Sequence, residues 1–383
     1  MEKRRIAILG STGSVGQQAL SVIREQSQLL EATLLVAHSN YKLLAEQAIQ
    51  FEVNSVIIID ERYYEALNEL LTQTDIKVFG GRGSLLDFLE SDSIDMVLNA
   101  IVGFAGLAAS LRCISLRKPL ALANKESIVV AGELIMKEIR QFQSPLIPVD
   151  SEPSAIFQCM KGEQFSDIKR IYLTASGGPF LNFPVDALKK VTPEQALKHP
   201  NWKMGPKISI DSAGLMNKGF EVIEAFWLFN LKPEQIDVLI HPSSVVHSMV
   251  QLTDGSLKAH AAYPDMKIQI QYALAYPMRP SNSFPTIDFS RPTQWDFSPT
   301  RKEDYPNLQL AYQVLDKQGN TGCTLNAANE IAVDAFLKHR IAFTDIPRIN
   351  EQTLNQMPFI PNPGLEELIQ TDKEARIIAE SLL

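Results

Sequence analysis

Short apolar runs alternate with amphipathic stretches along the first 150 residues of the chain. The apolar runs have the length of buried strands and lie at residues 6–9, 32–37, 55–59, 76–79 and 96–101. Between them, apolar residues recur at helical spacing over 17–26, 41–51, 61–72 and 85–89. This alternation predicts the α/β class with a doubly wound, mostly parallel sheet, and we assign residues 1–149 to that domain.

The pattern changes near residue 148, where longer segments become dense in polar residues. Residues 171–174, 237–240, 245–252 and 257–262 read as strands of a second sheet, and Asp254-Gly255 is typical of a hairpin turn. Residues 276–306 are rich in Pro, Ser and Asn, which predicts an extended linker. Helical spacing at 308–315, 327–337, 344–357 and 365–383 predicts a C-terminal bundle. We therefore expect an α+β catalytic domain over 150–275, a linker over 276–306 and a helical domain over 307–383.

Composition narrows the class of protein. The chain has 383 residues, 45% of them hydrophobic and 21% charged, which suits a globular protein of two or three domains. Its net charge of -8 argues against a nucleic-acid or anionic-membrane surface, so we expect a small-molecule partner. No apolar run approaches the roughly 20 residues of a membrane span, and the run after the basic residues 3–5 is too short for a signal peptide. We expect a cytoplasmic protein whose three cysteines are buried free thiols.

A glycine-rich loop follows the first predicted strand and opens a helix, which is the setting of a dinucleotide-binding turn. The loop comprises Gly10, Ser11, Thr12, Gly13, Ser14, Val15 and Gly16. A purely structural turn is the alternative, but the first strand-to-helix turn of an alternating domain favours a nucleotide. The second strand ends at His38, Ser39 and Asn40 without the acidic residue that NAD requires, so the sequence favours NADPH.

Carboxylates suggest a metal site in the second domain. Asp150 and Glu152 are separated by one residue after an apolar run, so we expect them on one face at the end of a strand. Glu221 lies in a strongly apolar helix, three residues after Lys218. All-oxygen ligands suit Mg²⁺ or Mn²⁺ better than zinc. A solvated turn or helix cap at 150–152 and a surface ion pair at Glu221 remain open alternatives.

Two polar segments suggest a phosphate site and a third suggests a flap. The phosphate candidates are Ser176, Ser212, Asn217 and Lys218, which lie beside glycines and predicted helix starts. The flap candidates, on a loop near 199–206 that could close over a ligand, are His199, Trp202 and Met204. Glycine turns and ordinary core packing are the alternatives, and His241 and His247 could equally be structural.

Several of these segments, taken in order, resemble the motifs of the 1-deoxy-D-xylulose 5-phosphate reductoisomerase family. The matching segments are 10–16, 123–127 (Ala-Asn-Lys-Glu-Ser), 149–152, 176–180, 199–205, 217–221 and 326–330 (Asn-Ala-Ala-Asn-Glu). The resemblance implies rearrangement and reduction of 1-deoxy-D-xylulose 5-phosphate to 2-C-methyl-D-erythritol 4-phosphate in isoprenoid precursor synthesis. It also implies NADPH, a divalent cation (Mg²⁺, Mn²⁺ or Co²⁺) and a homodimer.

The resemblance assigns roles residue by residue. It implies a catalytic group of Lys125, Asp150, Glu152 and Glu221, of which the last three hold the metal. It gives the substrate to Ser151, Ser176, His199, Trp202, Met204, Ser212, Asn217 and Lys218. For the cofactor it implies a larger set of residues. These are the glycine loop (residues 10–16), Ser39, Asn40, Asn124, Glu126 and Gly205.

The chain departs from the family pattern at a few positions. Pro153 and Ser154 replace His-Asn, Gly214 replaces Thr, and His241-Pro-Ser-Ser244 replaces His-Pro-Gln-Ser. The basic residue often found after the second strand is absent, because Ser39 stands there. These changes leave two alternatives open: a related enzyme for another phosphorylated keto-sugar, or a nucleotide-binding protein without turnover.

Overall fold

The computed structural model describes residues 2–181, 183–198, 201–202, 205–301 and 304–383, which fall into two compact units. Unit 1 comprises Met1–Asn124, Lys137–Asp150 and Met266–Pro285. Unit 2 comprises Lys125–Met136, Ser151–Asp265 and Thr286–Leu383. Both units are discontinuous in sequence, whereas the predicted domains are consecutive segments, and those predicted bounds stay a prediction. No helix among the described residues is both long enough and apolar enough to cross a membrane.

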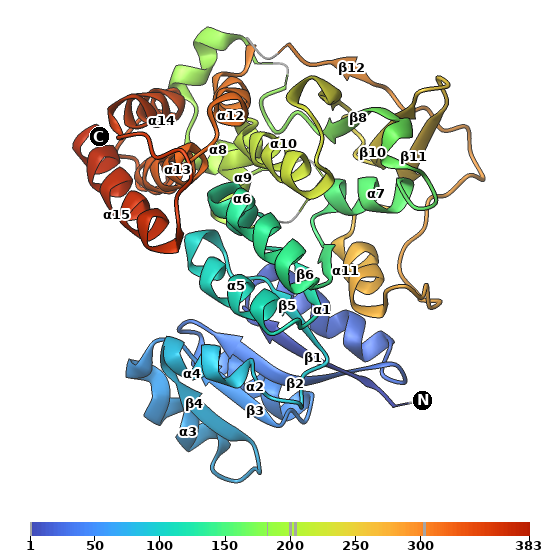
Figure 1. Cartoon of the computed structure of the whole chain (residues 1–383), viewed down its shortest axis with the longest axis vertical. Coiled ribbons are helices and arrows are strands. Elements are labelled where there is room, and N and C mark those ends of the chain that lie inside the picture. Colours follow the sequence, from blue (N-terminus) through green and yellow to red (C-terminus); the bar gives the residue numbers. More distant parts are fainter. Residues whose placement is uncertain (1, 182, 199–200, 203–204, 302–303) are drawn as a thin grey trace. The chain divides into compact units, whose positions relative to one another are not determined.

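Unit 1 is built on a parallel sheet with strand order β4-β3-β2-β1-β5-β6-β7 (Figure 1). Its strands are β1 (Arg4–Leu9), β2 (Leu30–Ala37), β3 (Ser55–Ile58), β4 (Lys77–Gly80), β5 (Met96–Asn99), β6 (Leu120–Leu122) and β7 (Leu146–Pro148). Ile6 through Leu9 are fully buried, as expected for a parallel strand covered on both faces. The strand order runs outward in both directions from β1 and β5, which confirms the predicted doubly wound sheet.

Helices connect the strands of unit 1. They are α1 (Ser14–Glu25), α2 (Tyr41–Gln50), α3 (Tyr64–Leu71), α4 (Gly81–Phe88), α5 (Leu107–Ser115) and the last part of α6 (Lys125–Phe142), with short 3-10 turns η1 (Glu61–Tyr63) and η2 (Gly103–Gly106). The helix predicted over 61–72 is divided, because the Asp60 side chain caps the separate turn η1 by accepting from the Arg62 backbone N–H. The chain returns later as α11 (Met266–Ala275), which packs against α1.

Unit 2 contains a mixed sheet with strand order β11-β10-β8-β9-β12. The strands are β8 (Ile168–Ala175), β9 (Ile236–Ile240), β10 (Val246–Leu252), β11 (Leu257–Ala261) and β12 (Ser298–Pro299). The predicted hairpin at Asp254-Gly255 is confirmed, since β10 and β11 pair antiparallel and Gly255 has φ +89°. The predicted linker is wrong in one respect: it contributes β12 to this sheet, where the ring of Phe297 stacks on that of His241.

Unit 2 also contains helices. They are α7 (Ser151–Cys159), α8 (Pro193–Ala196), α9 (Pro206–Ala213), α10 (Met216–Phe229), α12 (Pro306–Lys317), α13 (Thr321–Leu337), α14 (Asp345–Gln356) and α15 (Leu365–Ser381), with 3-10 turns η3 (Phe165–Asp167), η4 (Val185–Lys190) and η5 (Pro233–Gln235). Of these, α7 and α10 pack against the sheet. The apolar side of α10 lies in the unit's core, where Phe220 is 1% exposed. The predicted C-terminal helices are confirmed as α12 to α15, drawn in orange and red in Figure 1.

Candidate active site

The glycine-rich loop lies at the centre of the unit 1 sheet, where β1 ends and the strand order reverses. Gly10 has φ +87°, and a Cβ placed there would lie 2.7 Å from the carbonyl oxygen of Ala100, after β5. A Cβ on Gly16 would lie 2.3 Å from the carbonyl oxygen of Gly10. The buried hydroxyl of Ser11 finds no hydrogen-bond partner among the described residues. A tight, backbone-lined turn that opens a helix fits the pyrophosphate of a dinucleotide.

The other predicted cofactor residues divide between the two units. In unit 1, Ser39 and Asn40 are exposed after β2, and the Asn40 side chain accepts from the Leu43 backbone N–H at 3.3 Å. Asn124 is buried, and its amide donates to the Gly103 carbonyl at 3.0 Å. Glu126 and Gly205 belong to unit 2, and their part in a cofactor site stays a prediction.

The predicted carboxylates come together, although one expectation about them is wrong. Glu152 does not continue a strand: β7 ends at Pro148, and Glu152 is the second residue of α7. A helix therefore begins where a strand end was predicted, and Pro153 fits there because proline is tolerated in the first turn. Carboxylate oxygens of Asp150, Glu152 and Glu221 all lie within 4.8 Å of one another. Such an oxygen set suits a hard divalent cation.

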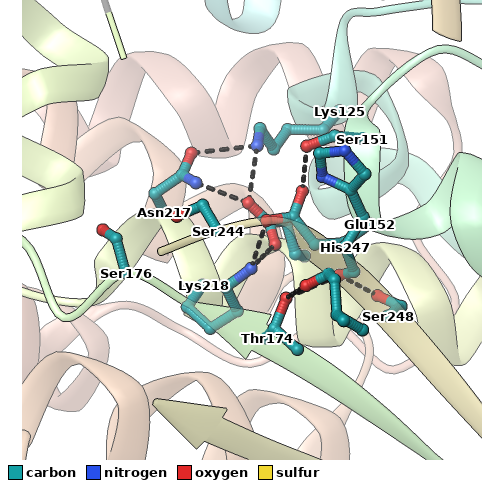
Figure 2. A network of polar contacts seen from close by, with 12 residues as sticks. Lys125, Ser151, Glu152, Thr174, Ser176, Asn217, Lys218, Ser244, His247 and Ser248 are labelled. Atoms are coloured by element: carbon teal, nitrogen blue, oxygen red, sulfur yellow. Dashed lines mark hydrogen bonds and ion pairs between the residues drawn. The ribbon is translucent and has the colours of Figure 1, made fainter. Parts of the chain in front are cut away.

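Lys125 and Lys218 form ion pairs with two of these carboxylates (Figure 2). Lys125, at the start of α6, places Nζ 3.3 Å from Glu221 and 2.9 Å from the Asn217 side-chain oxygen. Lys218 places Nζ 2.8 Å from Glu152 and also contacts Glu221. Because α10 presents residues three and four apart on one face, Asn217, Lys218 and Glu221 reach the same point. The cluster thus balances two carboxylates with two ammonium groups.

Burial strengthens these electrostatic interactions. Glu221 is 1% exposed, and the side chain of Lys218 is 4% exposed. Burial works against each charged form, yet the charge of Lys218 lowers the pKa of Glu152, and Glu152 and Glu221 raise the pKa of Lys218. Glu152 and Lys218 are therefore held in their charged forms. The Ser151 hydroxyl donates to the Glu152 carboxylate, which completes the network.

The two predicted phosphate segments are neighbours in unit 2. Ser176 follows β8, and its hydroxyl accepts from the Gly178 backbone N–H at 3.1 Å. Gly178 has φ +67°, and a Cβ there would lie 3.0 Å from the carbonyl oxygen of Ser212. Ser212 lies in the last turn of α9, just before the helix that carries Lys218. The turn and the helix end therefore pack backbone to backbone.

The predicted flap is described only in part. His199 and Met204 lie outside the described residues. The Asn201 amide donates to the Pro242 carbonyl at 2.6 Å and to the Ser244 hydroxyl at 3.0 Å. The Trp202 ring centroid lies 6.2 Å from that of His247, on β10. This segment thus contacts the turn that precedes β10.

His247 is a site neighbour that the sequence left undecided. It is 2% exposed, and its Nε2 finds no hydrogen-bond partner among the described residues. Burial lowers its pKa to about 4, so the imidazole is neutral at physiological pH. His241 is structural, since its Nδ1 lies 2.8 Å from the Asp296 carbonyl oxygen and its Nε2 accepts from the Val246 backbone N–H. The two histidines are only six residues apart in sequence. Their sequence spacing therefore could not show which one is structural and which one lies beside the site.

A sheet with a glycine turn that fits a dinucleotide, and a group of carboxylates that suits a divalent cation, are the features of a metal-dependent, dinucleotide-linked oxidoreductase. Family models described as 1-deoxy-D-xylulose 5-phosphate reductoisomerase match residues 6–132 and, for its C-terminal domains, 146–229 and 262–378. Reductoisomerases of that name from Bacteroides fragilis and Phocaeicola vulgatus are 49% and 50% identical, and the alignments span 100% of this chain and 99% of each relative. The chain belongs to the 1-deoxy-D-xylulose 5-phosphate reductoisomerase family, which confirms the resemblance.

Solved structures agree with this assignment. The reductoisomerase of Zymomonas mobilis in complex with NADPH superposes with a TM-score of 0.93 at 40% identity, covering 100% of this chain and 99% of that chain. A reductoisomerase in complex with NADPH, fosmidomycin and magnesium gives a TM-score of 0.92 at 36% identity, covering 99% and 98%. The predicted fold class is confirmed, as are NADPH and a divalent cation as the cofactors.

Proposed function

We propose that the chain converts 1-deoxy-D-xylulose 5-phosphate to 2-C-methyl-D-erythritol 4-phosphate with NADPH and a divalent cation, using the residues of the carboxylate and lysine cluster. The observation that carries this is the meeting of Asp150, Glu152 and Glu221 with Lys125 and Lys218. The candidate metal ligands therefore lie beside two ammonium groups, one of which, Lys218, is also a candidate ligand for the substrate phosphate.

The carboxylate cluster fits a divalent cation. Three carboxylate oxygens lie within 4.8 Å of one another, and the donor set is all oxygen. A cation bound there polarises a carbonyl and acidifies a neighbouring hydroxyl, and NADPH supplies the reducing equivalents. The ammonium of Lys125, next to Glu221, is placed to hold the substrate's oxygen atoms and to balance the charge that develops on them. Ser151 orients Glu152 through its hydroxyl.

Lys218 has a double task in this proposal. An ammonium group has three N–H donors, and two of them contact Glu152 and Glu221. The third can serve the substrate phosphate together with Ser176, Ser212 and Asn217. Lys218 would then connect phosphate binding with the metal ligands, and hold the remote end of the substrate in register with its reacting end.

The departures from the family pattern fit into this site without disturbing the cluster. Pro153 occupies the first turn of α7, and Ser154, which is fully buried, accepts from the Gln158 side chain at 3.2 Å. Neither residue removes a carboxylate or an ammonium group. The chemistry is therefore expected to survive, at a reduced rate if hydrogen bonds to the substrate are lost.

Three wider expectations accompany this function. The flap residues His199, Trp202 and Met204 close over the substrate and exclude water. The chain forms a homodimer, which sedimentation velocity tests. It acts in the cytoplasm, which cell fractionation tests.

Product identification decides the proposed function. Purified protein is mixed with 1-deoxy-D-xylulose 5-phosphate, NADPH and Mg²⁺, and the product is identified by mass and NMR. Consumption of NADPH with formation of 2-C-methyl-D-erythritol 4-phosphate is expected. Turnover only with another phosphorylated keto-sugar would establish the related enzyme instead, and NADPH binding without any turnover would establish a non-catalytic homologue.

A further inference from the structure

The motif Asn326-Ala-Ala-Asn-Glu330 has no role in the cluster described above, yet the structure buries both asparagines completely on α13. The Asn329 amide donates to Asp211 Oδ1 at 2.7 Å. Asp211 is 2% exposed and lies on α9, directly before Ser212. A buried carboxylate is costly unless hydrogen bonds and an opposite charge satisfy it, so this contact deserves a reason.

The contact is part of a network of polar side chains, here called the asparagine network, that contacts both ends of α9. It comprises Lys207, Asp211, Asn307, Asn329 and Asn350. At the first turn, Lys207 Nζ lies 2.9 Å from Asp211 Oδ2. At the other end, the Asn307 amide reaches the Gly214 carbonyl at a long 3.4 Å. The Asn350 amide joins the two halves, because it donates to the side-chain oxygens of Asn307 at 3.2 Å and Asn329 at 3.3 Å.

The asparagine network connects the C-terminal helices with residues on both sides of the carboxylate and lysine cluster. Three of its asparagines lie on α12, α13 and α14, and α9 carries Ser212 in its last turn. On the other side, Lys207 Nζ lies 3.4 Å from Glu126, the neighbour of Lys125 at the start of α6. Small changes in α9 would therefore move a predicted phosphate ligand while leaving the carboxylates on α7 and α10 in place.

We propose that Asn329, acting through Asp211, is a positioning residue for Ser212, so that the C-terminal helices set the affinity of the substrate's phosphate group. The proposal rests on the proposed function, since that function assigns Ser212 to the phosphate. Asn329 fixes the rotation of the last turn of α9, because Asp211 and Ser212 are adjacent on that turn. The metal site does not depend on this contact, because its ligands lie on other elements.

The asparagine network lies against one departure from the family pattern, Gly214. A Cβ at Gly214 would lie 2.9 Å from the Asn307 side-chain nitrogen. Gly214 has φ -101°, a conformation open to any residue, so a side chain here would meet the Asn307 amide rather than a backbone restriction. In this protein the Asn307 amide takes the room that a side chain at 214 would fill.

The test compares Asn329→Ala with Asn326→Ala. Asn326 is the matched control: it is equally buried on the same helix, but its amide donates to Glu330 at 3.0 Å instead. Binding of inorganic phosphate and of Mn²⁺ is measured by calorimetry for the full chain, together with KM and kcat. For Asn329→Ala we expect the Kd of phosphate and the KM to rise about three- to tenfold, the effect of one misplaced hydrogen bond. The control should leave both unchanged, and neither variant should change the Kd of Mn²⁺.

Equal phosphate affinity in the two asparagine variants would overturn the proposal, and so would a parent protein that binds no phosphate. A parallel loss of Mn²⁺ affinity in Asn329→Ala would also overturn it, by showing general loosening of the site. If Asn329→Ala fails to fold, Gly214→Ala tests the asparagine network at its other end, where Asn307 contacts Gly214. The Cβ that Gly214→Ala introduces should displace the Asn307 amide and weaken phosphate binding. Adding Asn307→Ala should remove that steric effect. Unchanged phosphate binding in Gly214→Ala would refute the proposal.

The two proposals fail separately. Absence of turnover with 1-deoxy-D-xylulose 5-phosphate would sink the proposed function, whereas the phosphate comparison needs no turnover and still decides the role of Asn329.

Discussion

Replacing Glu221 by glutamine is the sharpest perturbation of the cluster. Glutamine keeps the size of the side chain and removes its charge, so no cavity forms. In the structure, Glu221 accepts from Lys125 at 3.3 Å, and it also contacts Lys218 and Asn217. After Glu221→Gln, Lys218 keeps Glu152 as a partner at 2.8 Å, but the Lys125 ammonium, 7% exposed, loses its ion pair with residue 221.

The expected cost follows from the loss of the buried ion pairs that Glu221 forms with Lys125 and Lys218. Breaking a buried ion pair by removing one partner costs about 3–5 kcal/mol. Glutamine still offers an oxygen to the ammonium groups, so we expect the lower half of that range. A domain stability of about 5–15 kcal/mol can absorb this loss, so the variant should remain folded. The metal loses one of three carboxylates, and its affinity should fall by at least about 100-fold, since changes in outer-shell partners alone cost about 10- to 100-fold.

Urea unfolding in the presence of EDTA measures the stability change, and Mn²⁺ titration measures the metal affinity. Glu224→Gln is the control, because Glu224 lies one turn further along α10, is also 1% exposed and is not part of the metal group. The control should keep the Mn²⁺ affinity of the parent. If Glu221→Gln binds Mn²⁺ and turns over substrate like the parent, Glu221 is not a metal ligand and the reasoning is refuted.

Four further expectations can be checked independently. Lys218→Ala should raise KM for the phosphorylated substrate about ten- to more than a hundredfold, as loss of a charge-assisted contact of roughly 1.5–3 kcal/mol implies, and an unchanged KM would exclude the phosphate role. Because Ser39 stands where an acid would select NADH, kcat/KM should favour NADPH by roughly tenfold, and equal values would contradict this. The hydrogen bond from Arg5 lowers the pKa of Asp95, so Asp95→Asn should cost about 0.5–1 kcal/mol at pH 7. In urea unfolding that difference should begin to shrink near the ordinary carboxyl pKa of about 3.9 and vanish below the lowered pKa of Asp95, and a pH-independent difference would refute the pairing. Burial raises the pKa of the Cys113 thiol to about 12, and the other two cysteines are also buried, so rapid labelling of the native protein by a thiol reagent is not expected and would contradict the fold.

The sequence determined the alternation of strands and helices, because buried parallel strands leave continuous apolar runs such as Ile6–Leu9. It also located the glycine loop, since only small residues allow the backbone approach between Gly10 and Ala100. The helix at 107–115 and the long helix from 125 were not predicted from it. In α6 the first residues are almost all buried, so the helix has no polar face there to reveal its period.

Only the tertiary structure decided which polar residues meet. Residues 150–152 and 221 are about 70 positions apart, and the sequence could suggest but not establish that their carboxylates lie within 4.8 Å of one another. The partners of Asn329 were invisible for the same reason, because a buried amide bonded to a residue 118 positions away has no periodic signature. Local patterns depend on the spacing of neighbours along the chain, whereas this site depends on contacts between α6, α7 and α10 that form only when the core of unit 2 is packed.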